Sequence, residues 1–222
     1  MKRVSLLLFF ILLFSCQTLP VIDPPLSLKN EKSFICPSPF LKQKSHFVHA
    51  IETRMDGQTQ SAIIGVTAAD PVSRSIDCAI MTAEGMVLFE VQSGPDKLMV
   101  NRALPPFDSE NFAKNMIEDI KLIFFMPEGK LEKKGYLRDG STVCRHHEEN
   151  GDWIDIIKNT SADIEIRRYS SSGALKRQIF FNKMAKNIYQ HIELQAYDVF
   201  DYSLLMNLIE AQLVKSKKIK RK

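Results

Sequence analysis

The stretch that decides the fold is "IDCAIMTAEGMVLFEV", Ile76 to Val91. Apolar side chains alternate with other residues on both sides of Glu84-Gly85, and a period of two is typical of half-buried β-strands. A short glycine-containing segment between two such runs predicts a tight turn. The stretch therefore predicts an antiparallel hairpin.

The same alternation recurs along the chain. Ala62, Ile64, Val66 and Ala68 share one strand face, and further apolar runs occupy 163–169, 174–182, 187–197 and 202–214. Short turn signals separate several runs, namely Asp139-Gly140, Asn150-Gly151 and the "SSSG" that ends at Gly173. Roughly ten strands joined in this way predict an antiparallel meander that curls into an incomplete barrel. The run 202–214 is apolar on both faces, which predicts a central strand covered from both sides, with a helix as the alternative.

One segment departs from the strand pattern. Asp108 or Ser109 can cap a helix, and apolar residues follow at spacings of three and four. This stripe consists of Phe112, Met116, Ile117, Ile120, Ile123 and Phe124. Pro127 ends the helix, although the residues from Leu122 onward also read as a strand. We expect a helix this apolar to lie on the concave face of the sheet as a lid. The predicted fold is therefore mainly β with one helix, an α+β arrangement.

The N-terminus predicts export. Lys2 and Arg3 precede an apolar segment, 4–14, which is typical of a secretory signal peptide and too short for a permanent membrane span. The following "LFSC" resembles the bacterial lipobox. That resemblance implies that Cys16 carries a diacylglycerol and further acyl chains such as palmitate, and becomes the first residue of the mature protein. Gln17 favours sorting to the outer membrane, with the protein facing the periplasm.

The expected organisation has four parts. Residues 1–15 form the lipoprotein signal peptide, and 16–44 form an extended tether containing five prolines. Residues 45–214 form a single half-barrel domain. Residues 215–222, "KSKKIKRK", form a basic disordered tail, for which attraction to an anionic membrane surface is the alternative interpretation.

Charge argues against a nucleic-acid-binding protein, and the cysteine content limits the number of disulfides. The formal net charge is +4, but eight of the 30 basic residues lie in the first three residues and the last eight, so the folded body is acidic and nucleic acid is not an expected partner. Three cysteines follow Cys16, namely Cys36, Cys78 and Cys144, so at most one intramolecular disulfide can form among them. Their pairing stays open.

Motifs for catalysis and cofactors are missing from the sequence. It has no Gly-x-Ser-x-Gly elbow, phosphate-binding glycine loop or His-Glu-x-x-His, so neither an enzyme nor a cofactor is expected. In "CRHHEE", Cys144, His146 and Glu148 would share one side of a strand as possible zinc ligands, but the turn that follows favours a solvated hairpin end. We therefore expect no metal. His46 and His49 fall on opposite faces of a strand, which does not favour a metal site.

Two stretches carry a family resemblance. "TAEGMVLFEV", Thr82 to Val91, and "IEDIKLIFFMP", Ile117 to Pro127, resemble signature stretches of a family of uncharacterised bacterial outer-membrane lipoproteins. These proteins are in turn similar to the LolA/LolB lipoprotein carriers. The resemblance implies an incomplete antiparallel β-barrel, closed by helices, around an apolar cavity for acyl chains.

The expected function is therefore binding or transfer of an acylated cargo, lipid or lipoprotein, by a membrane-anchored carrier. The expected cavity-lining residues are Ile64, Val66, Ile80, Phe89, Met116 and Ile120. The alternative is an envelope scaffold that docks a protein partner through a sheet face or an edge strand.

Overall fold

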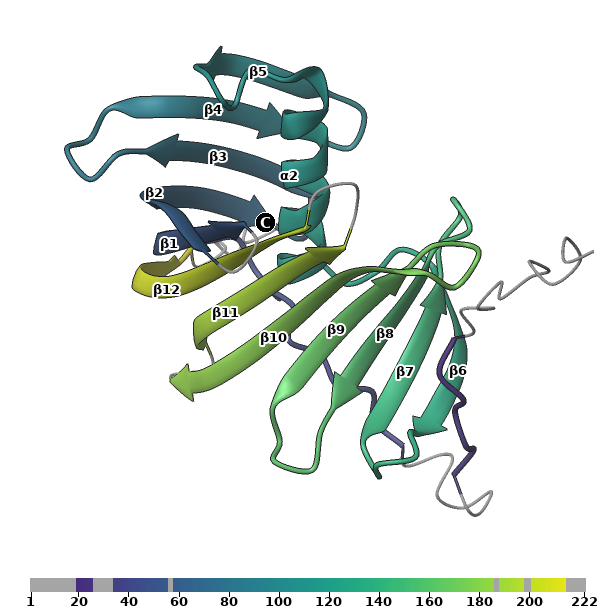
Figure 1. The fold of residues 1–222 in the computed structure, drawn as a ribbon. Coiled ribbons are helices and arrows are strands. Elements are labelled where there is room, and N and C mark those ends of the chain that lie inside the picture. Colours follow the sequence, from purple (N-terminus) through teal and green to yellow (C-terminus); the bar gives the residue numbers. More distant parts are fainter. Residues whose placement is uncertain (1–18, 26–33, 56–57, 186–187, 198–200, 215–222) are drawn as a thin grey trace, which may run out of the picture.

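The computed structural model describes residues 19–25, 34–55, 58–185, 188–197 and 201–214. Within them the chain forms a 12-stranded antiparallel sheet and one helix, α2 (Glu110–Phe124). Figure 1 shows the sheet bending around this helix without closing on itself. The predicted incomplete barrel with a helix on its inside is confirmed.

The strands follow one another along the chain as a meander. Those before the helix are β1 (Ser45–Met55), β2 (Gln58–Asp70), β3 (Ser75–Met81), β4 (Val87–Ser93) and β5 (Leu98–Ala103). Those after it are β6 (Lys130–Tyr136), β7 (Thr142–His147), β8 (Trp153–Lys158), β9 (Ile164–Tyr169), β10 (Leu175–Ala185), β11 (Ile188–Tyr197) and β12 (Asp201–Leu213). The order in the sheet is β5-β4-β3-β2-β1-β12-β11-β10-β9-β8-β7-β6. Pairing of β1 with β12 joins the two meanders, and β5 and β6 are left as the edges.

The sheet register defines two faces. Phe47 of β1 pairs with Thr67 of β2, and Ile80 of β3 pairs with both Gly65 and Phe89. We call the face that carries these side chains, against which α2 packs, the inner face, and the opposite one the outer face. The inner face supplies most of the buried apolar core, because alternate side chains along a strand point to the same side of the sheet.

The helix begins and ends close to its predicted bounds. Ser109 is the N-cap residue, but its side chain makes no capping hydrogen bond. The helix continues through Phe124, so the alternative of a strand from Leu122 is wrong. The apolar stripe buries Ile117, Ile120 and Ile123 against the sheet. No helix in the described ranges has the length and apolar character needed to cross a membrane.

The run 202–214 is the strand β12, and the alternative of a helix there is wrong. It is central, as predicted, because it lies between β1 and β11. Cover from both sides is not found, since Ile209 is 60 % exposed. Ile209 falls where the pairing of β12 with β1 shifts by one residue, so its side chain is turned out of the packed face.

The predicted turns join neighbouring strands. Gly140, between β6 and β7, and Gly151, between β7 and β8, have φ of +82° and +86°. Glycine adopts this left-handed conformation without the steric cost of a Cβ atom. These positions therefore explain why Asp-Gly and Asn-Gly pairs marked the hairpins in the sequence.

The described parts of the segment before β1, residues 19–25 and 34–44, pack on the domain instead of hanging free. Asp23 forms an antiparallel bridge to Tyr136 of the edge strand β6. Residues 34–44, which we call the N-terminal strap, run on to β1, and Phe40 in the strap is 6 % exposed. β1 begins at Ser45, where the domain was expected to start, but the packed unit includes the strap as well.

Candidate ligand-binding cavity

The two ends of α2 meet the inner face differently. At its N-terminal end, the ring of Phe112 lies edge-on against Phe89, with centroids 5.1 Å apart, and Phe107 packs on Phe112 at 5.2 Å. Phe89 is fully buried, as are Val91 on the same strand and Ile76 on the neighbouring β3. We call this region the packed end. Aromatic pairs in this geometry contribute beyond the apolar area they bury.

Polar groups join the middle of the helix to the second half of the sheet. The carboxylate of Asp119 accepts hydrogen bonds from Arg177 of β10 at 2.8 Å and from the Tyr202 hydroxyl of β12 at 2.7 Å. Burial raises the pKa of Asp119, while the charge of Arg177 opposes that rise. Removing one partner would leave a buried charge unpaired, so the cluster holds α2 in one position on the sheet.

At its C-terminal end the helix meets β1 and the strap. The ring of Phe124 stacks on Phe47 with centroids 4.9 Å apart. The backbone N–H of Leu41 in the strap donates a hydrogen bond of 2.9 Å to the Phe124 carbonyl. The last carbonyls of a helix have no partner within the helix, so this bond satisfies one of them and fixes the strap against α2.

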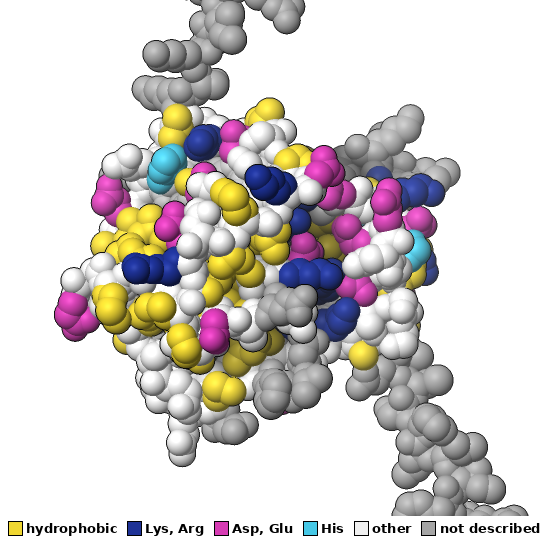
Figure 2. Space-filling view, turned by 90° about the horizontal axis from the view of Figure 1, so that it is seen from above, with side chains coloured by type: hydrophobic (Ala, Val, Ile, Leu, Met, Phe, Trp, Pro, Cys, Tyr) yellow, Lys and Arg dark blue, Asp and Glu magenta, His cyan; other side chains and the backbone are white. Residues whose placement is uncertain are grey.

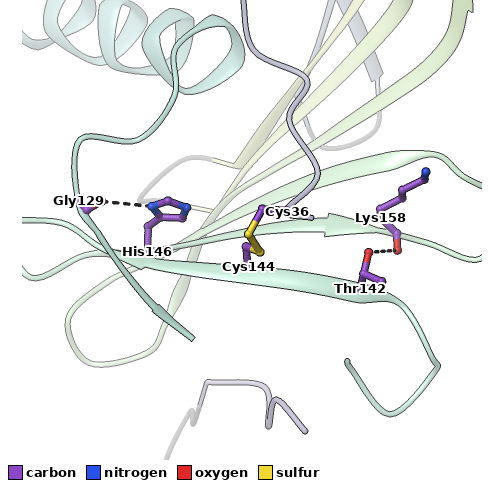
Figure 3. Close-up of a disulfide and its surroundings, with 6 residues drawn as sticks. All are labelled: Cys36, Gly129, Thr142, Cys144, His146 and Lys158. Carbon is purple, nitrogen blue, oxygen red and sulfur yellow. Dashed lines mark hydrogen bonds between the residues drawn. A yellow bond between two sulfur atoms is a disulfide. The ribbon is translucent and has the colours of Figure 1, made fainter. Parts of the chain in front are cut away.

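A disulfide holds the other end of the strap. Cys36 is bonded to Cys144 of β7, 108 residues further along the chain, with Cα atoms 5.7 Å apart (Figure 3). Cys78 is buried and not bonded, and burial raises the pKa of its thiol to about 11. The strap is therefore attached to β7 at one end and to α2 and β1 at the other.

A cavity of about 520 Å³ lies between the strap, the C-terminal end of α2 and strands β1, β10, β11 and β12. We call this region the cavity end. The volume falls within the range of about 300 to 1,000 Å³ typical of small-molecule sites. Its walls are mainly apolar. The lining side chains include Phe40, Leu41, Phe47, Ile123, Phe124, Phe181, Met184, Ile188, Tyr189, Ile192 and Leu213, with His49, Ser38, Ser45, Gln43 and Lys42 as polar members.

Two polar residues of this cavity are buried, and of these Ser45 already donates a hydrogen bond from its hydroxyl to the Gln43 carbonyl at 3.0 Å, which leaves His49 as the one that could contact a ligand. His49 is 4 % exposed and lies on the inner face of β1, 5.9 Å from the ring of Phe47. Burial lowers its pKa to about 4, so the imidazole is neutral near pH 7. His46, three residues earlier, is exposed on the outer face, which confirms the prediction that the two histidines point to opposite sides.

The six expected lining residues do not gather at this cavity. Ile64 and Val66 of β2 pair with Ala50 and Val48, so both lie on the outer face, away from α2. The other four do lie between sheet and helix, with Ile80 and Phe89 on the sheet and Met116 and Ile120 on α2. None of the six lines the cavity among the described residues.

The sequence contained a signal for the residues that do line it. Ile123 and Phe124 belong to the predicted helix stripe, and Phe181 lies in the predicted strand 174–182. Phe47 and His49 alternate on β1, the strand that contains the His46–His49 spacing. What the sequence could not indicate was that the strap passes over these side chains.

The set Cys144, His146 and Glu148 is not a metal site. The Cys144 sulfur is used in the disulfide. His146 Nδ1 donates to the Gly129 carbonyl at 3.2 Å (Figure 3), and Glu148 accepts a hydrogen bond from the Gly129 N–H at 3.1 Å. The described part of the chain holds no group of His, Cys, Asp and Glu side chains placed to bind a metal ion. Cys16 and residues 215–222 lie outside the described residues.

A second surface exposes apolar side chains at the β5 edge. Seen from above, the molecule shows hydrophobic side chains gathered on the face that includes β5 (Figure 2). Leu98 and Val100 of β5 are 43 % and 44 % exposed, and Met86, before β4, is 55 % exposed. The backbone groups on the far side of β5 have no strand partner among the described residues.

Comparison with known proteins identifies the fold. No family model and no curated protein matches the sequence. The crystal structure of a LolA superfamily protein from Nitrosomonas europaea is similar, with a TM-score of 0.50 and 10 % identity, covering 80 % of this chain and 90 % of that chain. A putative outer membrane lipoprotein-sorting protein domain from Vibrio parahaemolyticus gives a TM-score of 0.45 and 9 % identity, covering 80 % of this chain and 88 % of that chain. The first similarity shows a LolA-like fold.

Proposed function

We propose that the protein is a non-enzymatic lipoprotein that binds or transfers an acylated cargo, either a lipid or a lipoprotein. Acylation of Cys16 anchors it to the outer membrane, and the domain faces the periplasm. The observation that supports the proposal is the mainly apolar cavity of about 520 Å³ at the cavity end of α2. The LolA superfamily and lipoprotein-sorting descriptions of the similar structures agree with such a role.

The physical need for such a carrier is large. Each methylene of an acyl chain contributes about 0.8 kcal/mol when it leaves water, so a 16-carbon chain loses about 12 kcal/mol on full exposure. A cavity with aromatic and aliphatic walls offsets that cost without any chemical step. Phe47, Phe124 and Phe181 supply aromatic surface in this cavity, and Ile123 and Ile192 supply aliphatic surface.

Filling the cavity tests the proposal. Ile188 of β11 is half-buried and lines the cavity, whereas Ile64 of β2 is half-buried on the outer face. The full chain in phosphatidylcholine nanodiscs is irradiated with a palmitate that carries a diazirine, and peptide mapping locates the label. We expect Ile188→Trp to reduce labelling of cavity peptides about tenfold, because the indole occupies the space that a ligand needs. Ile64→Trp is the matched control and should label as the unmodified protein does.

An equal yield from both variants and the unmodified protein would contradict the proposal. So would label confined to peptides far from the cavity. The two variants exchange the same residue types on strands of one sheet, so they differ in the site of the added indole and not in its chemistry. Circular dichroism of each variant checks that point.

A second candidate function is docking of an envelope protein at the β5 edge. The exposed Leu98 and Val100 and the unpaired side of β5 favour it, since an extended segment can add to such an edge. A partner bound there should be lost with Val100→Lys and retained with Ile188→Trp, as measured by cross-linking in intact envelopes. A partner that is retained with Val100→Lys and lost with Ile188→Trp would indicate binding at the cavity instead.

A further inference from the structure

His49 is a buried polar side chain with no hydrogen-bond partner in the part of the chain that the structure describes. It is 4 % exposed, and within the described residues no side-chain or backbone group hydrogen-bonds to its ring. Buried polar groups in proteins are nearly always hydrogen-bonded. In the described residues, no side-chain nitrogen or oxygen that is fully enclosed lacks a partner. The ring nitrogens of His49 therefore retain contact with open space, and the space beside them is the cavity that His49 lines.

The chemistry of the site restricts what those nitrogens can bind. A neutral imidazole has one N–H donor and one acceptor nitrogen. No carboxylate lines the cavity among the described residues, and Lys42, a basic group of its lining, is exposed. A charged group brought beside His49 would lose its hydration without an opposite charge to replace it. An uncharged oxygen would complete the hydrogen bonding of the ring at little cost.

The surroundings of His49 fix the rest of the ligand. Phe47 on the same strand and Phe124 and Ile123 on α2 line the same cavity with aromatic and aliphatic surface. A ligand that contacts both His49 and these residues needs a hydrocarbon chain with an uncharged polar oxygen next to it. Acyl esters, acyl amides and hydroxylated acyl chains have this arrangement.

We infer that His49 is a specificity-determining residue that donates a hydrogen bond from its ring to an uncharged carbonyl or hydroxyl oxygen of the acyl cargo. The inference rests on the proposed function and deepens it. The hydrogen bond from His49 distinguishes two groups of ligands. Esters, amides and hydroxyl compounds bind with this hydrogen bond, whereas plain hydrocarbons bind by apolar contact alone. His49 thereby sets the depth at which the polar group of the cargo lies.

The test compares two competitors of equal chain length on the full chain in nanodiscs. A diazirine-bearing methyl palmitate labels the cavity, and unlabelled methyl palmitate or hexadecane competes with it. We expect methyl palmitate to compete about three- to tenfold better than hexadecane in the unmodified protein, the range of one net hydrogen bond. His49→Phe should abolish this preference, and His49→Gln, which retains a donor and an acceptor, should keep most of it.

Each result has a distinct meaning. Equal competition by the two compounds in the unmodified protein would overturn the inference and leave the proposed function intact, and this measurement needs no variant. A preference that survives in a folded His49→Phe protein would also overturn it. Failure of the probe to label the cavity at all would overturn the proposed function together with the inference.

Discussion

The two ends of α2 rest on the same sheet but leave different interiors. At the packed end, Phe89 is fully buried and the ring of Phe112 lies edge-on against it, with centroids 5.1 Å apart. At the cavity end, Phe47 and Phe124 stack on each other, and a cavity of about 520 Å³ remains beside them. The two ends differ in which segments pack over the inner face of the sheet. At the packed end, α2 and Phe107 before it cover the sheet, whereas at the cavity end the strap also forms part of the wall.

The largest expected effect concerns the disulfide that attaches the strap. Replacing both Cys36 and Cys144 by Ser should lower the free energy of unfolding by about 4 to 5 kcal/mol, because the bond closes a loop of 108 residues in the unfolded chain. Urea unfolding measures the loss. The strap lines the cavity, so labelling of cavity peptides should fall as well.

Reductant supplies the control for that variant. It should destabilise the unmodified protein by a similar amount and leave the double variant unchanged, because Cys78 forms no disulfide. A loss below about 1 kcal/mol in both experiments would mean that the strap is held by its packing and not by the bond.

The next largest effect separates the two ends directly. Phe89→Ala should cost about 4 kcal/mol of unfolding free energy, as expected for a fully buried aromatic side chain. Phe181 is similarly buried at 2 % exposure but borders the cavity, so it has fewer packing contacts and Phe181→Ala should cost less. Only Phe181→Ala should change labelling of the cavity. A larger loss from Phe181→Ala would contradict the distinction between the two ends.

A smaller effect follows from His49 at low pH. Its pKa falls from 6.5 in the unfolded chain to about 4 in the fold because of burial. Between these values the unfolded state binds more protons, so the free energy of unfolding decreases as the pH falls from 6.5 toward 4. The loss should reach about 3 kcal/mol, at 1.36 kcal/mol per pKa unit.

The pH effect is measured as the difference between the unmodified protein and His49→Phe in urea unfolding at pH 7 and pH 4.5. His46→Phe is the matched control, because His46 is exposed on the outer face of the same strand. The loss of unfolding free energy between pH 7 and pH 4.5 should be smaller by about 3 kcal/mol in His49→Phe than in the unmodified protein. In His46→Phe the loss should be as large as in the unmodified protein. Equal acid sensitivity in both variants would show that His49 is not the group responsible.

The sequence predicted the elements better than their faces. Alternation located β2, β3, β4 and β9 to β12, and the spacing of the helix stripe located α2, because both periods are properties of local backbone geometry. β2 shows why the face was wrong. Its outer face carries Ile64 and Val66, whereas its inner face includes Gly65, which has no side chain because a Cβ there would lie 2.6 Å from Ile51 Cδ1. Hydrophobic size alone therefore indicated the wrong side of this strand.

The cavity and the disulfide depended on contacts distant in the sequence. Five prolines in 17–44 favoured a free tether, and local composition contains no sign that Phe40 packs on the core or that Cys36 meets Cys144. The lining of the cavity comes from the strap, α2 and strands β1, β10, β11 and β12, so it combines residues from 38–49, 123–124 and 181–213. Such an arrangement is fixed by tertiary packing, which no periodicity in the sequence describes.

The bridge between Asp23 and Tyr136 has a consequence for orientation at the membrane. An anchor at Cys16 would be separated from Asp23 by only seven residue steps, a reach of about 25 Å in a fully extended chain. The β6 edge would therefore stay within one molecular width of the lipid surface. With such an anchor, the opposite edge of the sheet, β5, would lie on the side turned away from the lipid and would be accessible to a binding partner.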